Sequence, residues 1–426
     1  MNYTMNELIA YNERIEALIT EIGLDCYAQE FEIISFEDML CYEAYVGMPS
    51  HYPHWSFGKS YEKTKTLYSY NLTGLPYEMV INSDPCIAYL MKDNTLLLQV
   101  LTIAHVYGHN DFFKNNRMFK EYTHAKLTVE MFKNHANRIR NYIQDPSIGY
   151  EEVEKIIDAA HAIKFHCGAG CQLKGLEQKK VEYPYENLQE FLCLYGDLEE
   201  WQKDVLTIVM EENRYFIPQM ETKIMNEGWA SFWHYYILNK LDLDQGMQIE
   251  FLSTHNNVIS PLSGSLNPYY IGFKIWDSLY KKYNGDFKKL SQIREVERDA
   301  SFIRNYLTYE ICAECNLFEF EDVERYYVIS EVSNEEGWKK VRNTFAQNVG
   351  LGLIPAIEIE EVLKGENTLV LNHVWDGREL NLSYATETLK HIQTLWGGKV
   401  VLKTNFTKVP RKIVCNKSKK VLIEND

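Results

Sequence analysis

The sequence has no apolar run long enough to cross a bilayer. Its most apolar stretch, residues 96–106, is interrupted by Gln99, Thr102 and His105, whereas a membrane-spanning helix needs about 20 apolar residues. The first 24 residues carry four glutamates where the apolar part of an export signal would lie. We therefore expect a cytoplasmic protein without a transmembrane segment or a signal peptide.

Proline and glycine are scarce, with 11 and 22 residues among 426. Both interrupt regular elements, so short loops and long helices are expected. Apolar residues make up 46% of the chain and charged residues 24%, which excludes a mainly disordered or collagen-like chain. At about 150 residues per domain, the length predicts two or three domains.

The chain also lacks the basic excess of a nucleic-acid-binding surface. Its 44 basic and 60 acidic side chains give a net charge of −16, so no nucleic-acid partner is expected. Residues 403–426 depart from this balance, with seven basic and two acidic side chains. This segment could contact phosphates or an anionic membrane surface, but we favour a solvated tail, because charge runs are usually solvated.

Two kinds of reactive motif are absent or weak. Glycine-rich phosphate loops are missing, so nucleotide-dependent chemistry has no local support. The nine cysteines are odd in number and scattered, which favours free thiols in a reducing compartment. The pairs Cys167, Cys171 and Cys312, Cys315 could bind a metal or act in redox chemistry, but ordinary thiols are favoured because about 140 residues separate the pairs.

Apolar periodicity predicts a mainly helical first part. Helices are expected from Asn94, as N-cap, to about residue 109, and over residues 121–142, 151–165 and 198–214, the last ending near Pro218 before another helix that reaches residue 240. Residues 252–268 are rich in Ser, Asn, Gly and Pro, so a loop is expected there, with helix resuming after Pro268.

The pattern changes after about residue 324. Strands are expected over residues 326–331, 357–362, 368–373 and 399–403, and helices over residues 334–348 and 385–395. The order βαββαβ is typical of a ferredoxin-like domain. The predicted fold is therefore α+β, with a large helical domain (residues 1–322), a small ferredoxin-like domain (residues 323–405) and a basic C-terminal tail (residues 406–426).

The segment AHVYGH places two histidines on one helix face. His105 and His109 are four residues apart and continue the apolar stripe of Leu97 and Leu101. Two inward histidines at this spacing are typical of zinc-binding helices. In zinc peptidases a glutamate that follows the first histidine is the general base, but here Val106 occupies that position. A metal scaffold without its usual base is one interpretation, and two hydrogen-bonded core histidines are the other.

The segment MNEGWASFWH supplies a candidate third ligand. Glu227, Ser231 and His234 share one helix face, and a buried carboxylate is costly unless it is paired or metal-bound. Thermolysin-like enzymes take their third ligand from an Asn-Glu pair on a later helix, which Asn226-Glu227 resembles. We predict a His₂Glu site for Zn²⁺ or another divalent transition metal; a hydrogen bond from Glu227 to a His or Trp is the alternative.

Two further segments carry candidate residues. Asp158 and His161 share a helix face at a spacing found in metal sites of helix bundles, so His161 could be a ligand or the partner of a ligand. Glu78 lies among polar groups embedded in aromatic sequence, a composition typical of a cleft. Glu78 is the candidate general base in place of Val106, and His234 is a second candidate catalytic residue. A structural network is the alternative for both segments.

Several longer blocks resemble the stage V sporulation protein R (SpoVR) family. They include HWSFGKSYE, AHVYGHNDFFKNN, MNEGWASFWHYYILN and LNPYYIGFKIWD, and the resemblance extends from about residue 10 to residue 405. It implies a role in formation of the spore cortex, a modified peptidoglycan, and a location in the mother cell. The positions that match the family include His54, Glu78, Asn82, His105, His109, Asn110, Asp158, His161, Glu227 and His234.

Two functions of different classes fit these observations. The first is a metal-dependent hydrolase with a gluzincin-like helical core, in which His105, His109 and Glu227 hold the ion and His161 or His234 adds a ligand or supports one. This enzyme would hydrolyse an amide or peptide bond in a cell-wall precursor or a protein. The second is a non-enzymatic assembly or regulatory factor, for which Val106 marks lost chemistry and the small domain and basic tail contact partners.

Overall fold

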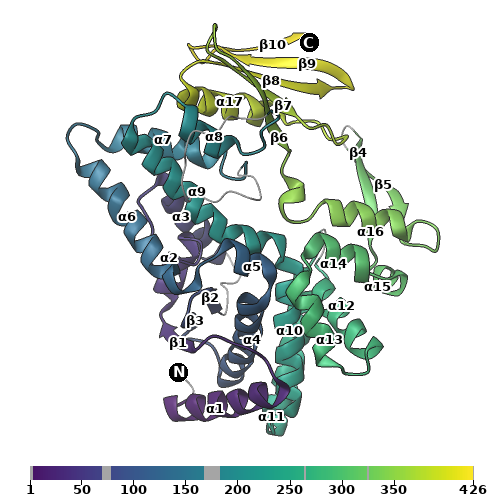
Figure 1. Ribbon diagram of the computed structural model, residues 1–426. Helices are drawn as coiled ribbons and strands as arrows, with labels where there is room; N and C mark the ends of the chain where they lie inside the picture. Colours follow the sequence, from purple (N-terminus) through teal and green to yellow (C-terminus); the bar gives the residue numbers. More distant parts are fainter. Residues whose placement is uncertain (1–2, 70–77, 167–182, 263–264, 324–325, 426) are drawn as a thin grey trace. The chain divides into compact units, whose positions relative to one another are not determined.

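The computed structural model describes the chain apart from residues 1–2, 70–77, 167–182, 263–264, 324–325 and 426, and for residues 321–323 and 326–327 it describes only the backbone. The described chain is mainly helical and includes a C-terminal five-stranded mixed sheet (Figure 1), which confirms the α+β class. It divides into two compact units, one with Met1–His51, Trp55–Lys133 and Phe216–Leu353, the other with Tyr52–His54, Asn134–Tyr215 and Ile354–Asp426. The units interleave along the chain, whereas the expected boundaries at residues 322 and 405 are sequential and stay a prediction.

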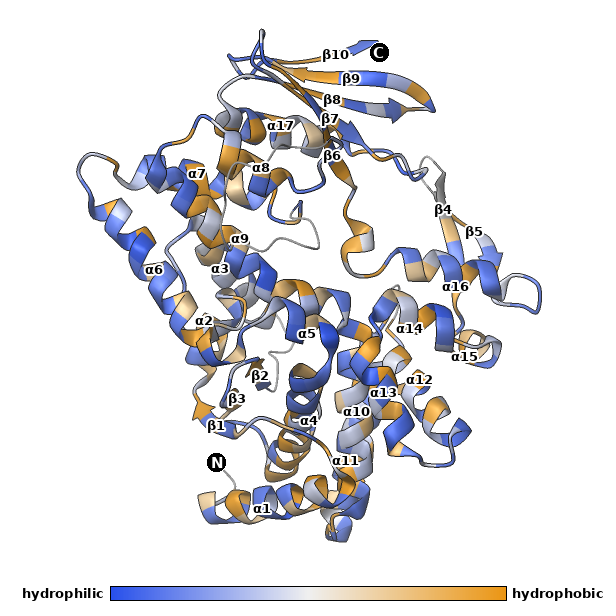
Figure 2. Cartoon of the chain, viewed as in Figure 1, coloured by the Kyte–Doolittle hydropathy of each residue, from blue (hydrophilic) through white to orange (hydrophobic). Residues whose placement is uncertain are grey.

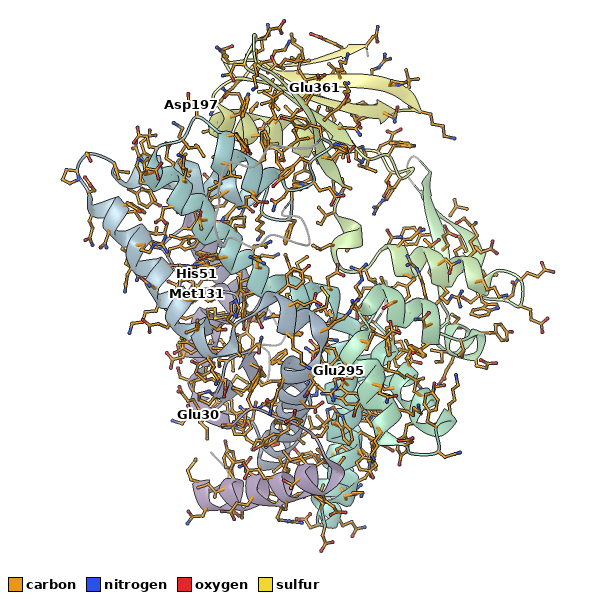
Figure 3. The ribbon with its side chains drawn as sticks, in the orientation of Figure 1. Glu30, His51, Met131, Asp197, Glu295 and Glu361 are labelled. Atoms are coloured by element: carbon orange, nitrogen blue, oxygen red, sulfur yellow. The ribbon has the colours of Figure 1, made fainter. Side chains whose placement is uncertain are left out.

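The first unit holds most of the helices. They are α1 (Met5–Ile22), α2 (Phe36–Ala44), α3 (Trp55–Ser69), α4 (Leu96–Asn115), α5 (Arg117–Tyr122), α10 (Lys223–Lys240), α11 (Gln245–Val258), α12 (Pro268–Lys282), α13 (Phe287–Val296), α14 (Asp299–Tyr306), α15 (Tyr309–Glu314) and α16 (Trp338–Gln347). Its strands are β1 (Gln29–Ile34), β2 (Glu78–Ile81), β3 (Cys86–Met91), β4 (Phe318–Val323) and β5 (Tyr326–Val332). Glu30 on β1 and Glu295 on α13, both labelled in Figure 3, are exposed positions of this unit.

The N-cap of α4 is one residue later than expected. The hydroxyl of Thr95 accepts a hydrogen bond from the amide of Leu98 at 3.2 Å, while the amide group of Asn94 donates to Gln99 at 3.4 Å. Both residue types are good caps, so local preference alone did not separate them. The buried face of the helix is unaffected, because the apolar positions define it.

The helix break expected near Pro218 lies three residues later, after Glu221, and the loop expected over residues 252–268 is wrong in its first part. Pro218 lies inside α9 (Glu200–Glu221) and does not end it, since one missing N–H is outweighed where the surrounding helix is buried. The segment of residues 252–268 begins as helix, because α11 continues to Val258. There, burial of Phe251 and His255 outweighs the weak helix propensity of Ser and Asn.

Helices α4, α10 and α12 approach one another closely in the core of the first unit. A Cβ on Gly108 would lie 2.7 Å from the Cα of Ala230, and a Cβ on Gly228 would lie 2.4 Å from the Cα of Gly272. Glycine therefore sets both helix–helix distances, because any larger residue would force the backbones apart. Two buried tryptophan rings, 4.6 Å apart, pack beside this contact.

A small three-stranded sheet packs against α4 in the first unit. Its order is β1-β3-β2, with β1 parallel and β2 antiparallel to β3. Both β2 and β3 contact α4. Glu78 is the first residue of β2 and pairs with Leu90 of β3, so the sheet fixes the position of this carboxylate relative to α4.

The second unit combines helices with the five-stranded sheet. Its elements are α7 (Tyr150–Ala162), α8 (Leu188–Tyr195), β6 (Ile357–Leu363), β7 (Thr368–His373), α17 (Leu382–Trp396), β8 (Lys399–Phe406), β9 (Val409–Cys415) and β10 (Val421–Asn425), and the unit boundary falls within α6 (Thr128–Gln144) and α9. The strand order is β10-β9-β8-β7-β6, with only the β7–β8 pair parallel among these strands. Figure 2 shows both hydrophobic and hydrophilic stretches along β9, whose sequence is VPRKIVC.

The ferredoxin-like arrangement is wrong. The two strands, helix and strand expected over residues 357–403 form as β6, β7, α17 and β8, but β5 pairs with β4 in a separate two-stranded sheet. The sequence FEFEDV of β4 alternates apolar and acidic residues, which suits a strand. Pairing with this close neighbour along the chain carries a smaller loop-closure cost than pairing with a distant strand.

Residues 407–425 are not a solvated tail. Most of them lie in β9 and β10, and β9 buries Ile413, Val414 and Cys415. The lysines of this segment drew attention to its charge, but its apolar side chains extend the sheet next to β8. Within the described part of the chain, no helix combines the length and apolarity needed to cross a bilayer.

Candidate metal centre

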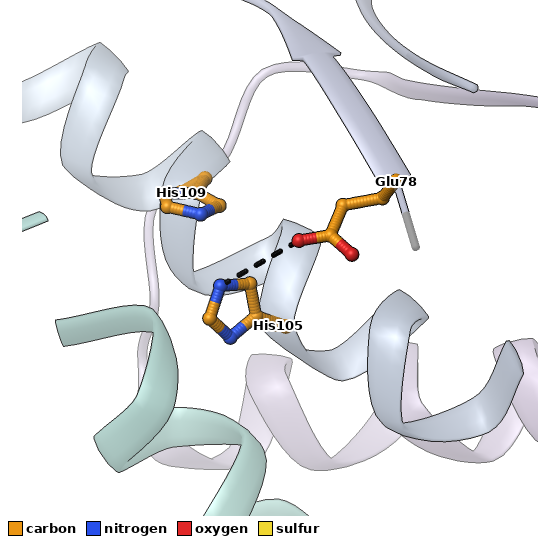
Figure 4. Close-up of side chains that lie close together, drawn as sticks. All are labelled: Glu78, His105 and His109. Atoms are coloured by element: carbon orange, nitrogen blue, oxygen red, sulfur yellow. Dashed lines mark ion pairs between the residues drawn. The ribbon is translucent and has the colours of Figure 1, made fainter. Parts of the chain in front are cut away.

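Helix α4 presents two histidines on one buried face. The side chains of His105 and His109 are almost completely buried, and their ring centroids are 4.6 Å apart. Figure 4 shows both rings on the side of the helix that faces β2. This confirms the shared inward face that the four-residue spacing predicted.

The carboxylate of Glu78 lies against this pair (Figure 4). Its Oε1 is 3.8 Å from Nε2 of His105. One ligand atom from each of Glu78, His105 and His109 lies within 4.8 Å of the other two, and among the residues that the structure describes this is the group with the geometry to hold a metal ion. Sequence reasoning named Glu78 as a base; the structure brings it into the metal-binding group itself.

Helix α10 adds a second carboxylate. Oε2 of Glu227 is 3.8 Å from Nε2 of His105 and 3.5 Å from Nε2 of His109. Nε2 of His105 and Oε2 of Glu227 are buried without a hydrogen-bond partner among the described residues, which is costly and rare in a native protein. Two ligands about 2.0–2.2 Å from a tetrahedral ion lie about 3.3–3.6 Å apart. The observed separations are close to that range, so these atoms are spaced like ligands of one ion.

The pKa values of the two carboxyl groups shift in opposite directions. Burial raises the pKa of Glu78; His105 opposes this rise and Glu227 adds to it. Burial would also raise the pKa of Glu227, but the imidazoles of His105 and His109 hold it below its usual value. Burial lowers the pKa of His109 to about 4, so this ring is neutral. A divalent cation next to these two carboxyl groups would offset the free-energy cost of burying their negative charge.

The second nitrogens of the two imidazoles bond to α10. Nδ1 of His109 lies 2.9 Å from Oδ1 of Asn226, and Nδ1 of His105 lies 2.9 Å from Nδ1 of His234. Metal-binding histidines typically use their second nitrogen in this way. Both nitrogens of His234 are engaged, since its Nε2 lies 2.8 Å from Nδ1 of His255. A catalytic role of His234 stays a prediction, and its contact with the site is through His105.

Two residues of the site were missed by sequence reasoning. The ring of Tyr269, at the start of α12, stacks on His105 with centroids 6.1 Å apart, and the charge of Glu227, burial and the charge of Glu78 raise the pKa of its hydroxyl well above the usual value. His255 lies in the segment that was expected to be a loop. A local signal for Tyr269 exists in the sequence: Asn267 and Pro268 mark the start of α12, which places Tyr269 in its first turn.

His161 lies in the second unit. Its Nε2 is 2.7 Å from the hydroxyl of Tyr52, and the neighbouring His54 pairs with Asp158 at 3.1 Å. His161 is not part of the group formed by Glu78 and the two histidines of α4. Ligation of the ion by His161 therefore stays a prediction.

Cys312 and Cys315 belong to no metal-binding group among the residues that the structure describes. Cys312 and Cys315 are free thiols near the end of α15. Burial raises the pKa of each to about 11, so both are neutral thiols at ordinary pH. Cys167 and Cys171 lie outside the described residues.

Comparison with known proteins assigns nearly the whole chain to families. A model described as SpoVR like protein matches residues 2–180 and 170–354, and a model described as SpoVR-like C-terminal domain matches residues 355–406. "Uncharacterized protein YcgB" of Escherichia coli (strain K12) is 34% identical over 475 aligned positions, which cover 94% of this chain and 92% of that protein. No solved structure matches the chain.

Proposed function

Because the chain belongs to the SpoVR-like family and its helical unit brings the carboxyl groups of Glu78 and Glu227 against the two buried histidines of α4, we propose that it is a metal-dependent hydrolase. His105, His109 and Glu227 hold the ion in a gluzincin-like arrangement of α4 and α10. The observation that carries this proposal is the buried Nε2 of His105, which has no hydrogen-bond partner among the described residues and lies 3.8 Å from a carboxylate oxygen of Glu78 and 3.8 Å from one of Glu227.

The residues divide the chemistry between them. A bound Zn²⁺ would polarise a carbonyl and make a water molecule more acidic. With an ion bound, Glu78 would accept a proton from that water, the task for which its raised pKa suits it. The neutral hydroxyl of Tyr269 donates a hydrogen bond to the oxygen on which charge develops. Glu227 stays ionised as a ligand, since the two imidazoles lower its pKa.

Family membership supports the choice of substrate. The SpoVR resemblance implies work on spore cortex, so an amide or peptide bond of a peptidoglycan precursor is the proposed substrate. The two-nitrogen, one-carboxylate donor set suits zinc, and catalytic zinc sites commonly use it with an open fourth position. A cytoplasmic location would restrict the enzyme to precursors made inside the cell or to cytoplasmic proteins.

One observation favours a second candidate, a non-enzymatic assembly factor on the same scaffold. Val106 occupies the position of the usual general base and is completely buried on α4. If Glu78 does not act as the base, the metal centre would be structural. The exposed lysines in the turns on either side of β9, Lys408, Lys417, Lys419 and Lys420, would then form a candidate partner surface on the second unit.

Elemental analysis of purified protein tests the metal centre. We expect about one equivalent of zinc or another transition metal in the wild type and in His373→Asn, a buried histidine of β7 that serves as the matched control. Loss is expected in His105→Asn and Glu227→Gln, each folded by circular dichroism. Absence of metal from the wild type, even after reconstitution, would contradict the proposal.

A second measurement separates enzyme from assembly factor. Glu78→Gln is expected to keep a metal ion but to lose hydrolysis of a peptidoglycan-precursor peptide by about 100-fold or more, because a general base contributes about 10²–10⁴-fold. A metal-replete wild type without hydrolytic activity on peptidoglycan precursors or protein substrates would favour the assembly factor.

A further inference from the structure

Three buried imidazoles form a chain that leads away from the metal centre. His105 on α4, His234 on α10 and His255 on α11 are 3%, 0% and 2% exposed. The links are Nδ1 to Nδ1 at 2.9 Å and Nε2 to Nδ1 at 2.8 Å. The side chain at the far end packs among the rings of Tyr235 and Phe273, with centroids 4.6 and 5.0 Å away.

The chain permits only two arrangements of protons. Each nitrogen–nitrogen hydrogen bond needs one N–H and one lone pair, and a neutral imidazole has one of each. His234 uses both nitrogens, so it must donate in one link and accept in the other. The protons of the chain therefore all point toward the metal centre or all point away from it.

These two arrangements differ at Nε2 of His105. When the protons point inward, His105 accepts at Nδ1 and carries its proton on Nε2, which then faces Glu78 and Glu227. When they point outward, His105 donates from Nδ1, and its Nε2 lone pair faces the two carboxylates. Only the outward arrangement can bind an ion, since a metal ligand nitrogen must be unprotonated.

The two metal-binding histidines differ in what fixes them. His109 bonds to an amide oxygen of Asn226, which only accepts, so its Nδ1 carries the proton whatever happens elsewhere. His105 bonds to a ring nitrogen that can either donate or accept. Its tautomer therefore depends on His234, and that of His234 depends on the lone pair of His255.

We propose that His234 and His255 are positioning residues that hold His105 as the Nδ1–H tautomer and thereby keep its Nε2 lone pair directed at the metal. The inference rests on the proposed metal centre. It assigns to a hydrogen-bonded imidazole chain the task that a carboxylate or carbonyl performs for many metal-binding histidines.

The test is the Zn²⁺ affinity of variants, measured by competition with a chromogenic chelator. His234→Leu is expected to bind Zn²⁺ about 10–100-fold more weakly, the range typical of lost ligand-orienting partners. His234→Asn is expected to stay within a few-fold of the wild type. Its Oδ1 can occupy the place of the ring Nδ1 and only accepts a hydrogen bond from His105.

The effect of replacing His255 should depend on which residue occupies position 234. His255→Leu is expected to weaken Zn²⁺ binding about tenfold in the wild type, but to have no effect when residue 234 is Asn, because an amide oxygen needs no partner to set its direction. A purely structural role would weaken binding equally in both backgrounds. Phe251→Leu, a buried neighbour of His255 on α11, is the packing control and should leave the affinity unchanged.

The outcomes are distinguishable. If the wild type itself binds no Zn²⁺, the proposed function fails. If the wild type binds Zn²⁺ and His234→Leu, folded with an unchanged melting temperature, binds it equally well, the positioning role alone is overturned. If His234→Leu does not fold, the comparison of His255→Leu in the wild-type and His234→Asn backgrounds decides, and equal losses in the two backgrounds overturn the inference.

Discussion

The surroundings of each buried carboxyl group in the candidate site determine the direction in which its pKa shifts. The two carboxyl groups of the candidate site show this: Glu227 has two imidazoles beside it and its pKa falls, whereas burial dominates at Glu78 and its pKa rises. Pairs of carboxyl groups whose environments separate their pKa values are typical of acid–base sites. The proposed division into ligand and base therefore follows from position and not from residue type.

A histidine outside the site provides a pH-dependent test at the residue scale. His135 is buried, with Nε2 3.0 Å from Glu211 and Nδ1 3.2 Å from Glu212. Burial alone would lower its pKa, but hydrogen bonds to the two carboxylates raise it above the usual value. Protonated His135 therefore stabilises the second unit, fully below about pH 6.5 and progressively less as pH rises through the raised folded pKa.

We expect His135→Gln to lower the stability more at about pH 6 than at about pH 9. Urea denaturation of the two proteins at both pH values measures this difference. Lys155→Gln, whose exposed ion pair with Glu152 is worth little, is the control and should show no such dependence. An equal loss of stability at both pH values would contradict the inference that protonated His135, bonded to Glu211 and Glu212, stabilises the unit.

Among the elements, close contacts between helices place the functional side chains. Gly108 lies between the two histidines of α4 and meets Ala230 of α10, while Gly228 follows Glu227 and meets Gly272 of α12. Ligand residues and contact residues are thus neighbours along each helix. Any change in the distance between these helices changes the separation of the ligands.

Gly228→Ala is therefore expected to destabilise the protein by about 1–3 kcal/mol or more, because its Cβ would lie 2.3 Å from the carbonyl carbon of Gly272. It should also reduce metal content by moving Glu227. Thermal melting and elemental analysis measure both effects. Gly58→Ala in α3, where an added Cβ meets nothing within 4 Å, is the matched control and should gain about 0.5–1 kcal/mol.

At the scale of the whole molecule, the five-stranded sheet ties the C-terminal residues to the second unit. The match to the SpoVR-like C-terminal domain ends at residue 406, but β9 follows and pairs with β8 along its length. Ile413 and Cys415 of β9 are completely buried. The second unit therefore needs residues beyond the family match to complete its sheet.

Truncation after Phe406 is expected to destabilise the second unit, because it removes β9 and exposes β8. Truncation after Asn416 removes only β10, whose residues are mostly exposed, and should change the melting temperature little. Limited proteolysis and thermal melting of both shortened chains against the full chain measure the difference. Equal behaviour of the two truncations would mean that β9 contributes nothing to the unit.

The sequence by itself determined what depends on near neighbours along the chain. The spacing of His105 and His109 placed both on one helix face, and the position of Glu227 in an apolar helix marked a carboxylate that needs a partner. The strand over residues 357–362 followed from the alternation of apolar and acidic residues at its start. Each of these depends on a period of 3.6 or 2 residues, which local order alone expresses.

Tertiary structure alone decided which distant residues meet. Glu78, on a strand 27 positions before His105, reaches its imidazole only because β2 packs on α4. His255 continues the imidazole chain from a segment whose composition predicted a loop, and β5 pairs with β4 and not with the C-terminal sheet. The physical reason is that periodicity specifies which face of an element is buried, whereas close packing between elements, here through glycine contacts, specifies what that face touches.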